Sequence, residues 1–118
     1  MWEVEFTDEF EVWGQTLSEP EQDALDASVK LLERLGPQLP RAHADTLNGS
    51  RYHHMKEFRT QCQGRPLRTF FAFDPRRSAI LLIGGDKTGD DHFYDRMLPV
   101  ADDLYDMHLR QLAEEGLI

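Results

Sequence analysis

The segment from Met55 to Tyr94 constrains the fold of this chain more than any other. It holds three short apolar or aromatic runs, separated by turn residues at Gly64-Arg65-Pro66 and at Asp74-Pro75-Arg76-Arg77. Runs of this length, bounded by Gly, Pro and Asp, are typical of strands joined by tight turns. The sequence therefore predicts a three-stranded antiparallel meander, with strands near residues 54–62, 67–73 and 78–84.

Positive charge is concentrated in the same segment. Residues 51–87 contain eight Lys or Arg and three Asp or Glu, whereas five of the 13 basic and 19 of the 22 acidic residues lie elsewhere. The net charge of −9 argues against nucleic-acid binding over the whole surface. Binding of phosphates by a local patch depends, however, on the electrostatic field at that patch and not on the net charge of the chain. The predicted sheet is the part of this acidic chain that is suited to contact phosphates.

The residues before this segment predict one strand and two helices. Apolar and acidic residues alternate over positions 2–6, which indicates a half-buried strand with three inward side chains, Trp2, Val4 and Phe6. Thr7 is a helix cap, and Ser18 begins a capping box with Pro in the first turn of a second helix. That helix ends at the Gly-Pro pair 36–37. The two helices together predict a helical hairpin.

The remaining segments are a linker, a central strand and a last helix. Residues 37–54 are rich in turn formers and predict a weakly structured connection. Residues 79–83 are apolar at every position, as in a strand covered on both faces. A last helix is expected to begin near Asp90 or Asp91, with Pro99 interrupting it.

Composition limits the class of protein and its compartment. The length of 118 residues predicts a single domain over 1–118. No run is long enough to span a membrane, and the N-terminus does not read as a signal peptide. Cys62 is the only cysteine, which excludes an internal disulfide and favours the reducing cytoplasm. The spacing of Cys and His supports no zinc site, so neither a metal nor another cofactor is expected.

Five motifs in order give the chain a family resemblance. They are Leu35-Gly36-Pro37-x-Leu39, Met55-Lys56-Glu57-Phe58-Arg59, Leu67-Arg68-x-x-Phe71-Ala72-Phe73-Asp74, Leu81-Leu82-x-Gly84-Gly85-x-Lys87, and Phe93-Tyr94 with Ala101-Asp102 beyond it. In these motifs the chain resembles the RelE/ParE toxin superfamily, and most closely its HigB-like, phage-derived branch. The resemblance implies an α+β, RelE-like fold: a mainly antiparallel four-stranded sheet with an N-terminal helical hairpin and a C-terminal helix.

The resemblance also implies a function and partners. RelE-like and HigB-like proteins are typically the toxins of type II toxin–antitoxin pairs, and they cut mRNA on the ribosome without a metal. The implied partners are translated mRNA and a cognate antitoxin with a helix-turn-helix DNA-binding fold. Fold alone does not fix the activity. Two alternatives stay open: a ParE-like inhibitor of DNA gyrase, and a catalytically inactive phage-derived binding protein.

Cleavage of RNA by its own 2′-OH needs a base, donors for the phosphorane and an acid. Matching motif positions gives five candidate catalytic residues: Arg68, Lys87, Lys56, Arg59 and Tyr94. Four further residues are candidate RNA contacts: Arg65, Arg76, Arg77 and His54. Three of the candidate catalytic residues have a purely structural alternative. Lys56 or Arg59 could form an ion pair with Glu57, and Tyr94 could pack the last helix on the sheet.

The chain departs from the family pattern in two ways. RelE-like toxins are usually basic, whereas this chain is acidic. Some HigB-like relatives place catalytic residues at the C-terminal end, whereas residues 113–118 here carry none of the expected types. The predicted site therefore depends on the sheet and on Tyr94.

Overall fold

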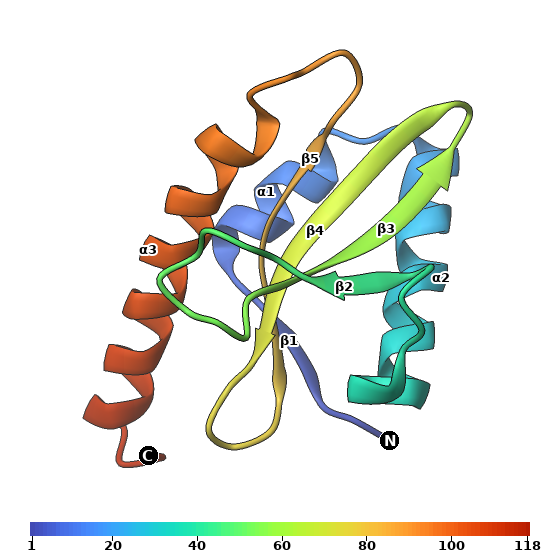
Figure 1. Ribbon diagram of the computed structural model, residues 1–118. Coiled ribbons are helices and arrows are strands. Elements are labelled where there is room, and N and C mark those ends of the chain that lie inside the picture. Colours follow the sequence, from blue (N-terminus) through green and yellow to red (C-terminus); the bar gives the residue numbers. More distant parts are fainter.

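The computed structural model describes residues 1–118 as one five-stranded sheet with helices on both faces (Figure 1). The strands are β1 (Val4–Phe6), β2 (Ala44–Thr46), β3 (Lys56–Cys62), β4 (Arg65–Phe73) and β5 (Ala79–Asp86). The helices are α1 (Asp8–Gln15), α2 (Glu19–Leu35) and α3 (Phe93–Glu114), with a short 3-10 helix, η1, at Gly36–Gln38. None of the helices is long and apolar enough to cross a membrane.

The sheet has the strand order β1-β5-β4-β3-β2. β1 runs parallel to β5 and every other pair is antiparallel. The predicted meander is present as β3, β4 and β5, and the α+β class is confirmed. The sheet has one strand more than predicted, because β2 forms inside the segment expected to be a linker. The three residues of β2 are too few to show an alternation of apolar and polar residues. β2 is held in the sheet by its pairing with β3, where Ala44 lies opposite Phe58.

Two apolar cores lie on opposite faces of the sheet. The α1–α2 hairpin covers one face and α3 covers the other (Figure 1). The hairpin core includes Leu32, Phe58 and Phe71, and the α3 core includes Phe70 and Phe93. Alternate residues of β5 enter both cores. β5 is therefore an interior strand covered on both faces, as its uninterrupted apolar run predicted.

Local capping explains where the first two helices begin. The Thr7 hydroxyl accepts a hydrogen bond from the backbone N–H of Phe10 at 3.0 Å. The capping box at Ser18 is complete, since Ser18 Oγ accepts from the N–H of Glu21 and the Glu21 carboxylate accepts from the N–H of Ser18. Both predictions are confirmed.

Two local predictions were wrong. Pro99 lies within α3 without ending it; it removes one helical hydrogen bond, and burial of the neighbouring Leu98 and Ala101 holds the helix on the sheet. Phe6 is 55% exposed rather than inward. β1 is an edge strand of three residues, and at its end the Phe6 ring lies beside the ring of Phe10, with centroids 6.2 Å apart, instead of entering a core.

The close approach of α1 to the sheet depends on Gly84. A Cβ at position 84 would lie 2.2 Å from Trp13 Cζ3, so we expect Gly84→Ala to destabilise the fold by about 1–3 kcal/mol, the usual cost of overpacking. Urea unfolding measures this. Gly14→Ala in α1 is the matched control, because nothing lies within 4 Å of its Cβ position. Equal stability of Gly84→Ala and the wild type would contradict the packing described here.

Candidate active site

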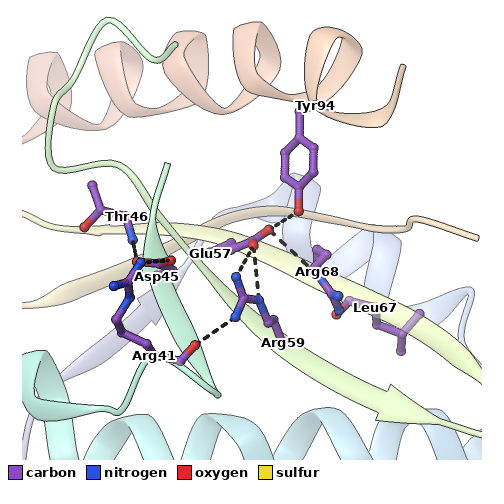
Figure 2. A network of polar contacts seen from close by, with 8 residues as sticks. All are labelled: Arg41, Asp45, Thr46, Glu57, Arg59, Leu67, Arg68 and Tyr94. Atoms are coloured by element: carbon purple, nitrogen blue, oxygen red, sulfur yellow. Dashed lines mark hydrogen bonds and ion pairs between the residues drawn. The ribbon is translucent and has the colours of Figure 1, made fainter. Parts of the chain in front are cut away.

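A buried carboxylate, that of Glu57, is the centre of a polar cluster between β3 and the first turn of α3 (Figure 2). Its side chain is only 3% exposed. Side chains alternate along a strand, so Glu57 and Arg59 share the face covered by α3, whereas Phe58 enters the hairpin core. We call Glu57, Arg59, Arg68, Lys87 and Tyr94 the Glu57 cluster.

Three side chains surround the Glu57 carboxylate. The Tyr94 hydroxyl donates a hydrogen bond to Oε1 at 2.7 Å. Arg59 donates from Nε and Nη2 to Oε2 at 3.3 and 3.2 Å, and its Nη1 donates to the backbone oxygen of Arg41. Arg68 Nε lies 3.9 Å from Oε1. The carboxylate thus holds a tyrosine from α3 and two arginines from adjacent strands in one arrangement.

Arg68 keeps an unused hydrogen-bond donor. It lies on β4 opposite Arg59, and its side chain is 13% exposed. Its Nη1 donates to the backbone oxygen of Leu67 at 3.1 Å, but Nε is buried and makes no hydrogen bond. Buried donors normally have partners, and a guanidinium N–H is well suited to a phosphate oxygen. Arg68 therefore holds a donor without a hydrogen bond beside the Glu57 carboxylate, whose Oε1 lies 3.9 Å away.

Lys87 completes the cluster from the loop after β5. Its ammonium lies 5.5 Å from the centre of the Tyr94 ring, a cation–π contact, and it forms no ion pair with a carboxylate. The Tyr94 side chain thus has a carboxylate at its hydroxyl and a cation over its ring.

The Tyr94 phenol holds its proton strongly. Burial, and then the hydrogen bond to the Glu57 carboxylate, raise the pKa of Tyr94 to about 12. At neutral pH the hydroxyl is consequently a proton donor and not a phenolate.

The pKa values of all three tyrosines of the chain are raised. Burial raises the pKa of Tyr105 to about 12, and the hydrogen bond to Asp106 raises the pKa of Tyr52. We expect absorbance titration of the folded chain to show no phenolate formation near pH 10, with ionisation at higher pH. Because the folded pKa values exceed the unfolded value, tyrosine-linked stability is present below pH 10 and declines as pH rises toward 12. Ionisation of all three tyrosines near pH 10, without unfolding, would contradict this arrangement. The control is the chain unfolded in guanidinium, in which the tyrosines have their ordinary pKa.

Lys56 lies apart from the other four predicted catalytic residues. It alternates with Glu57 on β3, so its side chain projects from the opposite face, and its ammonium donates to Thr46 Oγ1 at 3.4 Å. The structure thus brings together Arg59, Arg68 and the two residues from the loop and helix, Lys87 and Tyr94.

The predicted RNA contacts have other partners. Arg65 forms ion pairs with Glu21 and Asp86, and Arg76 forms ion pairs with Asp74 and Glu5. Two of these acids, Glu21 and Glu5, lie outside residues 51–87, so part of the positive charge of that segment is cancelled by acids that are distant in the sequence.

The remaining two lie outside the cluster as well. Arg77 is exposed, with its guanidinium 5.9 Å from the centre of the Trp2 ring. His54 Nε2 lies 3.4 Å from the hydroxyl of Tyr105, and burial, with a smaller effect of His53, lowers the pKa of His54. No group of three or more His, Cys, Asp or Glu is arranged to hold a metal ion.

Comparison with known proteins places the chain in a family. The family described as phage derived protein Gp49-like (DUF891) matches residues 13–106, a span that contains the whole Glu57 cluster. The chain belongs to this family.

Two curated proteins of Mycobacterium tuberculosis are similar to this Gp49-like chain. The candidate toxin HigB3 is 43% identical over 93 residues, which are 78% of this chain and 80% of HigB3. The candidate toxin HigB2 is 38% identical over 104 residues, 86% of this chain but 52% of HigB2.

The fold of the Gp49-like chain is also similar to a solved toxin structure. A double mutant of the Escherichia coli toxin RelE in the free state superposes with a TM-score of 0.56 at 8% sequence identity. The match covers 81% of this chain and 94% of RelE. The RelE-like fold is confirmed, and the similarity to HigB3 confirms the resemblance to the HigB-like branch.

Sequence reasoning missed the central place of Glu57 in this Gp49-like protein. The sequence predicts Glu57 only as an ion-pair partner, and its ion pair with Arg59 is present. Glu57 and Arg59 stand two apart on a predicted strand, which puts them on one face. A carboxylate flanked on that face by Met55 on one side and Arg59 on the other was the available signal.

Proposed function

We propose that this chain is the toxin of a type II toxin–antitoxin pair and that it cleaves translated mRNA on the ribosome without a metal. The observation that carries the proposal is the convergence of two arginines and a protonated tyrosine on the buried carboxylate of Glu57, with Lys87 over the ring of that tyrosine. Membership in the Gp49-like family and similarity to HigB proteins support it.

Glu57 is the general base of the proposed reaction. Its carboxylate takes the proton of a ribose 2′-OH, and the 2′-oxygen then bonds to the adjacent phosphorus. Negative charge builds up on the non-bridging oxygens of the phosphorane. The guanidinium groups of Arg68 and Arg59, which keep 13% and 34% of their side chains exposed, donate hydrogen bonds to those oxygens.

Tyr94 is the general acid. As the bond from phosphorus to the 5′-oxygen breaks, the phenol gives its proton to that oxygen, and Lys87 stabilises the phenolate from its position over the ring. The hydrogen bond of 2.7 Å between Tyr94 and Glu57 returns the proton taken from the 2′-OH to the phenol. The products are a 2′,3′-cyclic phosphate and a 5′-hydroxyl, and both residues regain their starting states.

The experiment is inducible expression of the wild type beside Arg68→Ala/Lys87→Ala. Growth is recorded and mRNA 5′ ends are mapped by primer extension, with and without a translation block. The matched control is Lys30→Ala/Arg34→Ala, which removes the same charge from exposed positions of α2. We expect growth arrest and translation-dependent cuts with the wild type and the control, and neither with Arg68→Ala/Lys87→Ala.

Other outcomes separate the alternatives. Growth arrest with intact mRNA would exclude the nuclease and favour a gyrase inhibitor. Absence of arrest by the wild type would favour an inactive binding protein. Cuts that persist in the double variant would remove the Glu57 cluster from the mechanism.

A further inference from the structure

A second surface, far from the Glu57 cluster, has the properties of a docking site. A groove of about 1040 Å³ lies between the β1–α1 junction and the C-terminal half of α3. Its apolar lining includes Phe6, which is 55% exposed, and Met107, which is 54% exposed. Met107 follows Tyr94 by thirteen helical residues, so the groove lies roughly 20 Å along α3 from the candidate active site.

The same phenylalanine also lines a second hollow. This hollow, of about 260 Å³, lies between α1 and α2 and has Phe10 and Leu25 in its lining. Phe6 is thus an exposed apolar ridge with a hollow on either side. Large exposed apolar side chains that gather in this way mark interaction sites more often than isolated ones do. We call the two hollows and the ridge the Phe6 groove.

The rim of the Phe6 groove is acidic. The larger hollow is lined by five carboxylates and two guanidinium groups. One of these guanidinium groups, that of Arg76, is already bonded to Glu5 and Asp74. The smaller hollow is lined by Glu11 and Asp26 and by no Lys or Arg. Such a field repels nucleic acid and anionic lipid, and it also repels a second copy of this chain, whose net charge is −9.

We propose that the Phe6 groove binds a basic amphipathic segment of a partner protein. Apolar side chains of the segment enter the hollows on either side of Phe6, and its Lys and Arg side chains face the acidic rim. In a toxin–antitoxin pair the segment belongs to the antitoxin, and this assignment rests on the proposed function. The binding chemistry of the groove does not depend on that function. A segment bound only in this groove leaves the Glu57 cluster uncovered.

The test uses the full chain and a labelled synthetic peptide of about 16 residues, roughly four helical turns. Leu occupies one face of the peptide and Lys the other, and a twin peptide carries Glu in place of every Lys. Binding is followed by fluorescence anisotropy at about 0.15 M salt, where the field of distant charges is screened. We expect the Lys peptide to bind and the Glu twin not to bind.

Two variants separate the groove from general attraction between opposite charges. Phe6→Ser/Met107→Ser removes the apolar contacts without changing net charge, and we expect it to weaken Lys-peptide binding about tenfold or more. Val12→Ser is the matched control, since Val12 is 62% exposed and lines neither hollow; its affinity stays at the wild-type value. Circular dichroism verifies that both variants are folded.

Two results would overturn the inference: no binding of the Lys peptide, or equal binding by the wild type and Phe6→Ser/Met107→Ser. Neither result bears on the proposed nuclease activity, because that activity is tested separately by mapping mRNA 5′ ends. Conversely, intact mRNA together with groove-dependent peptide binding would remove the nuclease and leave the docking surface in place.

Discussion

We expect Glu57→Gln to lower the rate of mRNA cleavage by about 10²–10⁴-fold, the usual contribution of a general base. Gln has nearly the same shape as Glu, and its amide oxygen still accepts the hydrogen bond from Tyr94 that Glu57 receives. It takes up no proton at neutral pH, so the 2′-OH is no longer activated. The rate is measured on mRNA bound to ribosomes, with variant and wild type at equal concentration.

The matched control is Glu21→Gln. Glu21 is also buried and also forms an ion pair with an arginine, Arg65, but it lies at the start of α2, outside the Glu57 cluster. We expect its cleavage rate to stay within about twofold of the wild type, since it touches no group assigned to the reaction. A Glu57→Gln rate equal to that of Glu21→Gln would exclude Glu57 as the base.

We expect Asp74→Ala to destabilise the fold by about 3–5 kcal/mol, the cost of removing one partner of a buried ion pair. The Asp74 side chain is fully buried at the turn between β4 and β5. Oδ1 accepts the backbone N–H groups of Arg76 and Ser78, and Oδ2 accepts from the Arg76 guanidinium at 2.8 Å and lies 2.9 Å from His108 Nε2. All of these groups lose their partner in Ala. Urea unfolding measures the loss, with Asp23→Ala on the exposed face of α2 as control.

The same carboxylate gives the stability a pH dependence. Burial alone would raise the pKa of Asp74, but hydrogen bonds from Arg76, His108 and the Ser78 backbone outweigh it and hold the pKa below its ordinary value. The Asp74 contribution is therefore complete above the unfolded pKa near 4 and is lost as pH falls through the folded pKa. We expect the stability difference between wild type and Asp74→Ala to shrink below pH 4. A difference that is unchanged from pH 7 to pH 3 would contradict this account.

Much of the fold was predictable because its determinants are local. The caps at Thr7 and Ser18 each satisfy backbone donors within three residues, and the apolar run of β5 reports burial on both faces directly. β2 and Phe6 were mispredicted because their environments come from elsewhere in the chain. β2 depends on β3 as a template, and the exposure of Phe6 follows from the edge position of β1.

The candidate site was predictable in part through the family resemblance. Motif positions identified Arg59, Arg68, Lys87 and Tyr94, which the fold brings together. The central place of Glu57 depends on Tyr94, which lies 37 residues further along the chain. Likewise, the sequence suggested a basic sheet because the partners of its arginines are distant: Glu21 lies 44 residues from Arg65, and Glu5 lies 71 residues from Arg76.

The most direct test of the proposed chemistry is the end groups of the RNA fragments that the wild-type chain produces on ribosome-bound mRNA. Attack by the 2′-OH predicts a 2′,3′-cyclic phosphate on the upstream fragment and a 5′-hydroxyl on the downstream one. It also predicts that a single 2′-deoxynucleotide at the cut position abolishes cleavage there. A 5′-phosphate on the downstream fragment, or undiminished cleavage at the deoxynucleotide, would contradict the roles assigned to Glu57 and Tyr94.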